Sequence, residues 1–292
     1  MPDKSSIPFL IAPDYLPDHF SHWYLLSSHL QRESGCTLSL ELPAAHSEMN
    51  TLLAEGNIGL LYANAFLAAR LIREQGWLPL VRPINRYDEV LVAVAADSPY
   101  QSLCELPTDA LIQSRPNQDI HHIGLRLLRE SCLNTEGIRL SEADSLSLVA
   151  SALLKGEAQA GFFTADIYHH LSKHTRDNLR VLQESQLGNV SHLFVLHPKH
   201  ADLQDTLQQA FCGMADKPAA ALILESLDMP EGFATFTAEE AEAMTAWMLE
   251  TTPPAGEQAD QAAEAAADTP AENTAETADN SGKETAETDK TA

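Results

Sequence analysis

Short apolar runs alternate with stretches of helical spacing over residues 1–250, and this alternation constrains the fold more than any other feature of the sequence. The run at 7–13 ends at a proline, as a buried strand does where it meets a loop. Residues 17–33 then carry apolar side chains at helical spacing, and Gly35 stands where a helix C-cap is expected. Strands that alternate with helices in this way predict parallel α/β sheets.

The alternation stops after residue 82 and restarts at residue 89, so we expect two α/β units. The predicted strands are 7–13, 37–42, 58–62, 78–82, 89–95, 110–112, 158–163, 179–182 and 192–197. The predicted helices are 17–33, 47–55, 65–73, 120–132, 147–155, 203–215, 219–226 and 238–249.

The last part of the chain has a different composition. Residues 252–292 contain no Val, Ile, Leu, Phe, Trp or Tyr, and from Glu257 onward there are ten acidic residues and two lysines. Such a segment cannot bury enough apolar surface to offset the entropy of ordering it. We therefore expect residues 251–292 to form a disordered, acidic C-terminal tail that keeps the protein soluble.

Charge and hydropathy exclude several classes of partner. The chain carries 18 basic and 42 acidic residues, a net charge of −24, which argues against nucleic acid or an anionic membrane surface. No apolar run reaches the length of a membrane span, so no membrane insertion is expected.

The N-terminus and the cysteines bear on the compartment. The first residues lack the pattern of a secretory signal, which predicts a cytoplasmic protein, or a periplasmic one if the true start lies upstream. The four cysteines are isolated, without a CxxC pair, and are expected to be reduced.

Several segments of the chain together resemble a known family. They are 12–17 (APDYLP), 52–56 (LLAEG), 58–64 (IGLLYAN), 90–99, 102–106, 152–161 and 220–227 followed by Phe233. In order and spacing they resemble the type II solute-binding proteins, and most closely the phosphate/phosphite/phosphonate-binding family of ABC transporters.

This resemblance implies an α/β, two-lobed periplasmic-binding-protein type II fold with a hinge. Mapped onto the chain, lobe one would comprise 1–87 and 198–250, and lobe two 88–197, with crossings near 85–89 and 191–198. The ligand would lie in the cleft between the lobes, at the C-terminal ends of the strands.

Loop placement and the resemblance together select eight candidate ligand-binding residues: Tyr15, Tyr62, Asn64, Ser114, Arg115, Asn117, Ser145 and Asp166. Four of them also have a structural alternative. Asn64 and Asp166 are placed to cap the helices that follow them, Arg115 could be a solvent-facing loop residue, and Tyr15 an ordinary half-buried tyrosine.

The loop that contains Ser114 and Arg115 precedes a predicted helix, where unpaired backbone N–H groups and the helix dipole favour an anion. An arginine there can pair with a phosphate or carboxylate. The chain departs from the family at Ser145, where a histidine is usual, at Gln159 in place of an aspartate, and at Asp166 in place of a glutamate. These substitutions bear on which solute is bound.

No catalytic motif, cofactor motif or complete set of metal ligands is recognisable. The pairs His19/His22 and His170/His174 have helical spacing, but no further ligand completes a site, so no metal is expected. Asp88 and Glu89 are adjacent and should point to opposite faces of a strand.

The leading hypothesis is therefore a non-enzymatic binding protein for a small phosphonate- or phosphate-like anion or zwitterion, in transport or in sensing. Its expected partners are that solute and an ABC transporter permease. Two alternatives stay open: a cytosolic enzyme of the same fold, such as the chorismate dehydratases, and an effector domain detached from a transcription factor.

Overall fold

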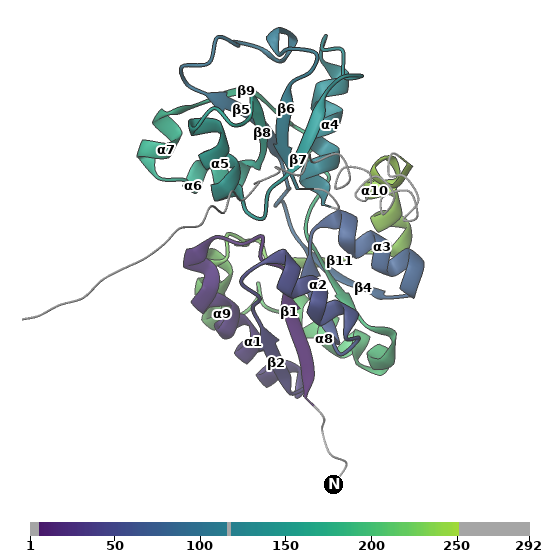
Figure 1. The fold of residues 1–292 in the computed structure, drawn as a ribbon. Coiled ribbons are helices and arrows are strands. Elements are labelled where there is room, and N and C mark those ends of the chain that lie inside the picture. Colours follow the sequence, from purple (N-terminus) through teal and green to yellow (C-terminus); the bar gives the residue numbers. More distant parts are fainter. Residues whose placement is uncertain (1–5, 116–117, 251–292) are drawn as a thin grey trace, which may run out of the picture. The chain divides into compact units, whose positions relative to one another are not determined.

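The computed structural model describes residues 6–115 and 118–250. The tail predicted for 251–292 and the candidate residue Asn117 lie outside the described residues. Within them the chain forms two sheets, each with its own helices (Figure 1). We call the part of the chain built around each sheet a lobe.

Within the described residues, the first lobe contains six strands: β1 (Ile7–Ile11), β2 (Leu38–Glu41), β3 (Leu60–Ala63), β4 (Leu78–Pro83), β10 (Leu193–Leu196) and β11 (Phe233–Thr235). Its helices are α1 (Phe20–Ser34), α2 (His46–Ala54), α3 (Ala65–Gln75), α8 (Gln204–Cys212), α9 (Pro218–Ser226) and α10 (Ala238–Glu250), with the 3₁₀ turns η1 (Pro17–His19) and η3 (Pro198–Leu203). The strand order is β11-β4-β10-β3-β1-β2.

The second lobe contains, among the described residues, five strands: β5 (Val90–Ala95), β6 (Leu111–Ser114), β7 (Arg139–Glu142), β8 (Ala160–Thr164) and β9 (Leu179–Glu184). Its helices are α4 (Asp119–Glu130), α5 (Leu146–Leu154), α6 (Ala165–His170) and α7 (Lys173–Asp177), with the 3₁₀ turn η2 (Leu103–Glu105). The strand order is β7-β6-β8-β5-β9.

Local sequence signals account for several of these boundaries. Helices α1 and α3 end at Gly35 and Gly76, which adopt left-handed backbone conformations with φ of 69° and 68°. Helix α3 begins after Asn64, whose side chain accepts a hydrogen bond from the Leu67 N–H, and α5 begins after Ser145, which caps it in the same way. Polar side chains at these positions satisfy backbone N–H groups that the helix itself leaves unpaired.

The apolar faces of the elements meet in a dense core on each sheet. In the first lobe Trp23, Phe194 and Phe211 are almost completely buried between the sheet and α1 and α8. In the second lobe Phe162 of β8 lies beneath α4, where Gly124 allows the helix to approach: a Cβ on that glycine would lie 2.4 Å from the Phe162 ring. Helix α10 packs against α3 and also contacts α4 of the second lobe (Figure 1).

The sheets are mixed rather than purely parallel, which corrects one expectation. Strands β1, β2 and β3 are parallel, but β10 is antiparallel to β3 and β4, and β5 is antiparallel to β8 and β9. Strand β10 also pairs within the first sheet, although the expected second lobe extended to residue 197. An apolar run shows that a strand is buried but carries no information about its direction.

The cysteines correct a second expectation. Cys104 of η2 and Cys132, just after α4, form a disulfide with their Cα atoms 5.2 Å apart, whereas Cys36 and Cys212 are free thiols. The pairing joins residues that are 28 positions apart, so no local spacing motif could have indicated it.

Among the described helices, none is both long enough and apolar enough to cross a membrane.

Candidate functional site

A cavity of about 300 Å³ lies between the two lobes; we call it the interlobe cavity. Four of the described helices begin at its wall. The lining includes Ala45, Asn64 and Gln118, which are the N-cap residues of α2, α3 and α4, and Asp144, which precedes the N-cap of α5. Each helix N-terminus presents a positive dipole end and backbone N–H groups that have no partner within the helix. The cavity is therefore suited to an anionic group.

Arg115 supplies a formal positive charge in this wall. Its side chain is only 7% exposed, and Nη1 lies 3.7 Å from Oδ1 of Asp14, a separation too long for a hydrogen bond. His46 at the start of α2 also lines the cavity, and its Nε2–H donates to the same Asp14 oxygen at 2.7 Å. Asp14 in the first lobe thus faces an arginine that comes from the second lobe.

Asp14 also belongs to a buried ionic chain at the hinge. Its second oxygen, Oδ2, lies 3.6 Å from Nε2 of His192, whose Nδ1–H donates to Asp88 Oδ2 at 2.8 Å. Asp88 and His192 stand in the two crossings that connect the lobes, between β4 and β5 and between β9 and β10.

Burial and charge act against each other on the pKa values of this chain. Burial alone would raise the pKa of Asp14, but the neighbouring His192 and Arg115 outweigh burial and lower it. Burial would likewise lower the pKa of His192, but Asp88 and Asp14 raise it well above its usual value. The two carboxylates therefore favour the protonated form of the imidazole.

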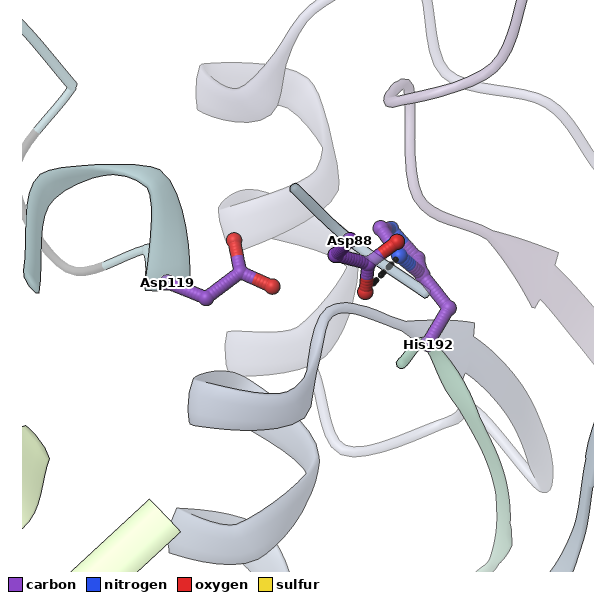
Figure 2. A group of neighbouring side chains, drawn as sticks. All are labelled: Asp88, Asp119 and His192. Atoms are coloured by element: carbon purple, nitrogen blue, oxygen red, sulfur yellow. Dashed lines mark hydrogen bonds and ion pairs between the residues drawn. The ribbon is translucent and has the colours of Figure 1, made fainter. Parts of the chain in front are cut away.

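Asp119 adds a third carboxylate from the first turn of α4. Its Oδ1 accepts a hydrogen bond from the Ile120 N–H, and its side chain faces Asp88 and His192 (Figure 2). Burial raises the pKa of Asp119, and the negative charge of Asp88 raises it further, to about 7.

We call Asp14, Asp88 and His192 the hinge cluster. A second, smaller cavity adjoins it and has a volume of about 30 Å³; we call it the hinge cavity. Tyr15, Tyr62 and Asp166 line it together with Asp14, Asp88 and His192. Arg86 of the first crossing donates to Asp166 Oδ2 at 3.2 Å, which ties the hinge to α6 of the second lobe.

The candidate residues from sequence are thus distributed over distinct environments. Asn64 and Arg115 line the interlobe cavity, and Tyr15, Tyr62 and Asp166 line the hinge cavity. Ser114 is buried, and its Oγ is hydrogen-bonded to Nδ1 of His121 at 2.8 Å. Ser145 caps α5, next to the cavity wall.

Asn64 both lines the cavity and caps α3, which was its structural alternative. For Asp166 the capping alternative is not seen, because α6 begins at Ala165 and its N-cap residue is Thr164; the Asp166 carboxylate is ion-paired with Arg86.

Sequence reasoning missed His46, Asp14, Asp119 and His192. They are single polar residues in four separate segments, and no spacing rule connects them. Asp88 and Glu89 do point to different partners, as their adjacency predicted: Asp88 contacts His192, whereas Glu89 accepts hydrogen bonds from Ser185 and from the backbone N–H groups of Leu187 and Gly188.

Comparison with protein families gives a match over most of the chain. The model described as the periplasmic substrate-binding protein of phosphonate ABC transporters matches residues 9–241. A search of curated protein sequences finds no match.

Solved structures agree with the family match at the level of the fold. PhnD1 from Prochlorococcus marinus, solved with methylphosphonate, has a TM-score of 0.71 at 11% identity, covering 85% of this chain and 98% of its own. A binding protein component of an ABC phosphonate transporter from Pseudomonas aeruginosa has a TM-score of 0.71 at 13% identity, covering 90% and 94%. The periplasmic aliphatic sulphonate binding protein SsuA from Escherichia coli has a TM-score of 0.57 at 15% identity, covering 83% and 85%. The shared architecture is the two-lobed, type II solute-binding fold.

Proposed function

Because the chain belongs to the family of periplasmic substrate-binding proteins of phosphonate ABC transporters, we propose that it binds one small phosphonate- or phosphate-like solute in the interlobe cavity. Proteins of this family are solute-binding components of transporters and are typically not enzymes. The observation that carries the proposal is the convergence of four helix N-termini and Arg115 on a single cavity of about 300 Å³.

The anionic group of the solute would lie at the start of α4. Gln118 caps this helix without a side-chain hydrogen bond to it, and the guanidinium of Arg115 lines the same wall. Backbone N–H groups and a guanidinium together match the three oxygens of a phosphonate. Each charge-assisted hydrogen bond of this kind contributes about 1.5–3 kcal/mol to binding.

The cavity also presents two carboxylates, those of Glu142 at the end of β7 and of Asp144 before α5. Both are exposed at the rim of the cavity rather than buried in its wall. A solute with an amino group could place its ammonium there while its anionic end faces α4. This arrangement favours a zwitterion such as an aminoalkylphosphonate over a bare anion.

The proposal is tested by titrating the full chain calorimetrically with methylphosphonate, 2-aminoethylphosphonate, inorganic phosphate and methanesulfonate. We expect at least one phosphorus oxyanion to bind with a stoichiometry of one and to be recovered unchanged. Arg115→Gln should weaken that binding by about tenfold or more, because it removes a charge-assisted contact.

The matched control is Arg129→Gln, which removes an exposed arginine of α4 that does not line the cavity. It should leave the affinity unchanged, and circular dichroism should show that both variants are folded. Equal affinities of the Arg115 and Arg129 variants would contradict the proposed site. Conversion of the solute to a product would favour the enzyme alternative.

We further propose that the protein works outside the cytoplasm, as a partner of an ABC transporter permease. The disulfide between Cys104 and Cys132 supports this location, because disulfides persist in oxidising compartments and are rare in the cytosol. Alkylation of the protein in acid-quenched cells should therefore modify Cys36 and Cys212 but not the other two cysteines. Alkylation of all four would indicate a reducing compartment.

A further inference from the structure

Three ligand-forming side chains meet where the crossings between the lobes approach the start of α4. They are Asp88, Asp119 and His192, and one potential ligand atom from each lies within 4.8 Å of those of the other two (Figure 2). The group lies beside the interlobe cavity but outside its lining.

Two carboxylate oxygens at this point are buried and have no hydrogen-bond partner. Asp119 is 3% exposed, and its Oδ2 is unpaired. Oδ2 of Asp14, whose side chain is 9% exposed, is also unpaired, 3.6 Å from Nε2 of His192. An unsatisfied buried acceptor costs about 1–3 kcal/mol, and more when it is charged. A cation between Asp88, Asp119 and His192 would satisfy the carboxylate of Asp119.

The space beside the cluster is of a size that suits a single ion. The hinge cavity, which Asp88 and His192 line but Asp119 does not, has a volume of about 30 Å³, more than the roughly 10–15 Å³ that one water-sized particle needs. A phosphonate-sized solute needs the interlobe cavity, which is about tenfold larger.

We propose that Asp88, Asp119 and His192 form a binding site for one divalent transition-metal cation, with Zn²⁺ as the best match. Imidazole nitrogen and carboxylate oxygen together are typical zinc ligands, whereas Ca²⁺ and Mg²⁺ prefer oxygen alone. Ligand atoms on a tetrahedral zinc lie about 3.4 Å apart, so atoms that lie within 4.8 Å of one another need to approach by at most about 1.4 Å. Asp14 is placed to hold the ring of His192 through Nε2, so Nδ1 would ligate the metal once its proton is released.

The proposed cation joins both crossings to α4, so it would hold the hinge in one arrangement. The metal-site proposal does not depend on which solute binds in the interlobe cavity or on the affinity of that solute. It also differs from the sequence expectation of no metal site, which considered only histidine pairs close together in the chain.

The test uses the full chain, stripped of metal with a chelator and titrated with Zn²⁺ against a chromophoric competitor. We expect one saturable site per chain, and Asp119→Asn and Asp88→Asn should each weaken it by tenfold or more. Both substitutions keep the shape of the side chain, and their folding is checked by circular dichroism. His174→Gln, which removes an exposed histidine of α7, controls for adventitious binding and should have no effect.

Anomalous scattering from crystals of the unmodified chain soaked in Zn²⁺ gives a result that does not depend on any variant. A peak between Asp88, Asp119 and His192 is expected. Peaks only on surface histidines, or a single-site affinity that neither aspartate variant changes, would overturn the proposal. Methylphosphonate titration of the chelator-treated protein is run in parallel, so that failure of the zinc site and failure of the solute site are distinguished.

Discussion

At the scale of single residues, the hinge cluster shows how buried charge is accommodated in this protein. Asp14 and Asp88 flank His192 within hydrogen-bond or ion-pair distance, and Arg115 approaches Asp14 from the second lobe. Breaking such a set by removing one member leaves an uncompensated buried charge, which typically costs about 3–5 kcal/mol. The cluster therefore ties the relative arrangement of the two lobes to the ionisation of a few side chains.

His122 is a buried histidine whose pKa is shifted in the opposite direction from that of His192. It lies on α4, and its ring packs on Phe66 of α3 with the ring centroids 4.3 Å apart, across the boundary between the lobes. Burial lowers the pKa of His122 to about 3. A histidine that stays neutral in the folded state destabilises that state at any pH where the same histidine is protonated in the unfolded chain.

The lowered pKa of His122 predicts that the folded state loses stability as the pH falls. Its contribution to stability is fully present above about pH 6.5, the pKa of an unfolded histidine, and is lost as the pH falls toward about 3. Over that range the loss amounts to about 1.4 kcal/mol per pH unit. Urea unfolding at pH 7.5 and pH 5 should show that His122→Gln loses less stability on acidification than the unsubstituted chain.

The control for this comparison is His174→Gln, at an exposed position on α7. It should lose as much stability between pH 7.5 and pH 5 as the unsubstituted chain. The account of His122 would be wrong if both variants showed the same pH dependence.

At the scale of elements, most strands and helices could be predicted because each has a local cause. Apolar alternation predicted β2, glycines with positive φ end α1 and α3, and Asn64 and Ser145 cap the helices that follow them. These signals lie within a few residues of the element that they define, so no tertiary contact is needed to recognise them.

The two strands that were missed lack such signals. Strand β7 is polar and largely exposed, and β11 is only three residues long. Both are strands because a neighbouring strand offers backbone hydrogen bonds, β6 in one case and β4 in the other. The same reason explains why strand direction was not predicted: the pairing partner of β10 comes from segments more than a hundred residues away.

At the scale of the whole molecule, the cavity could be anticipated but its chemistry could not. Loops after strands were expected to face a cleft, and Asn64 and Arg115 do line the interlobe cavity. His46, Asp14 and His192 were not anticipated, because they converge only when two lobes and two crossings come together. A site assembled from segments spread over residues 14–192 leaves no motif in the sequence.

The two-lobed arrangement also explains why the helix N-termini matter. Helices α2 and α3 belong to the first lobe, and α4 and α5 to the second, yet residues at the start of each line one cavity. An anion between them would interact favourably with both lobes at once and would favour the arrangement in which they face each other.

A crystal structure of the protein with methylphosphonate tests the central claim most directly. The account predicts density for the phosphonate group inside the interlobe cavity, within hydrogen-bond distance of the Arg115 guanidinium and of backbone N–H groups at the start of α4. Density for the phosphonate only outside this cavity, or inside it but away from Arg115 and from every helix N-terminus, would contradict the account.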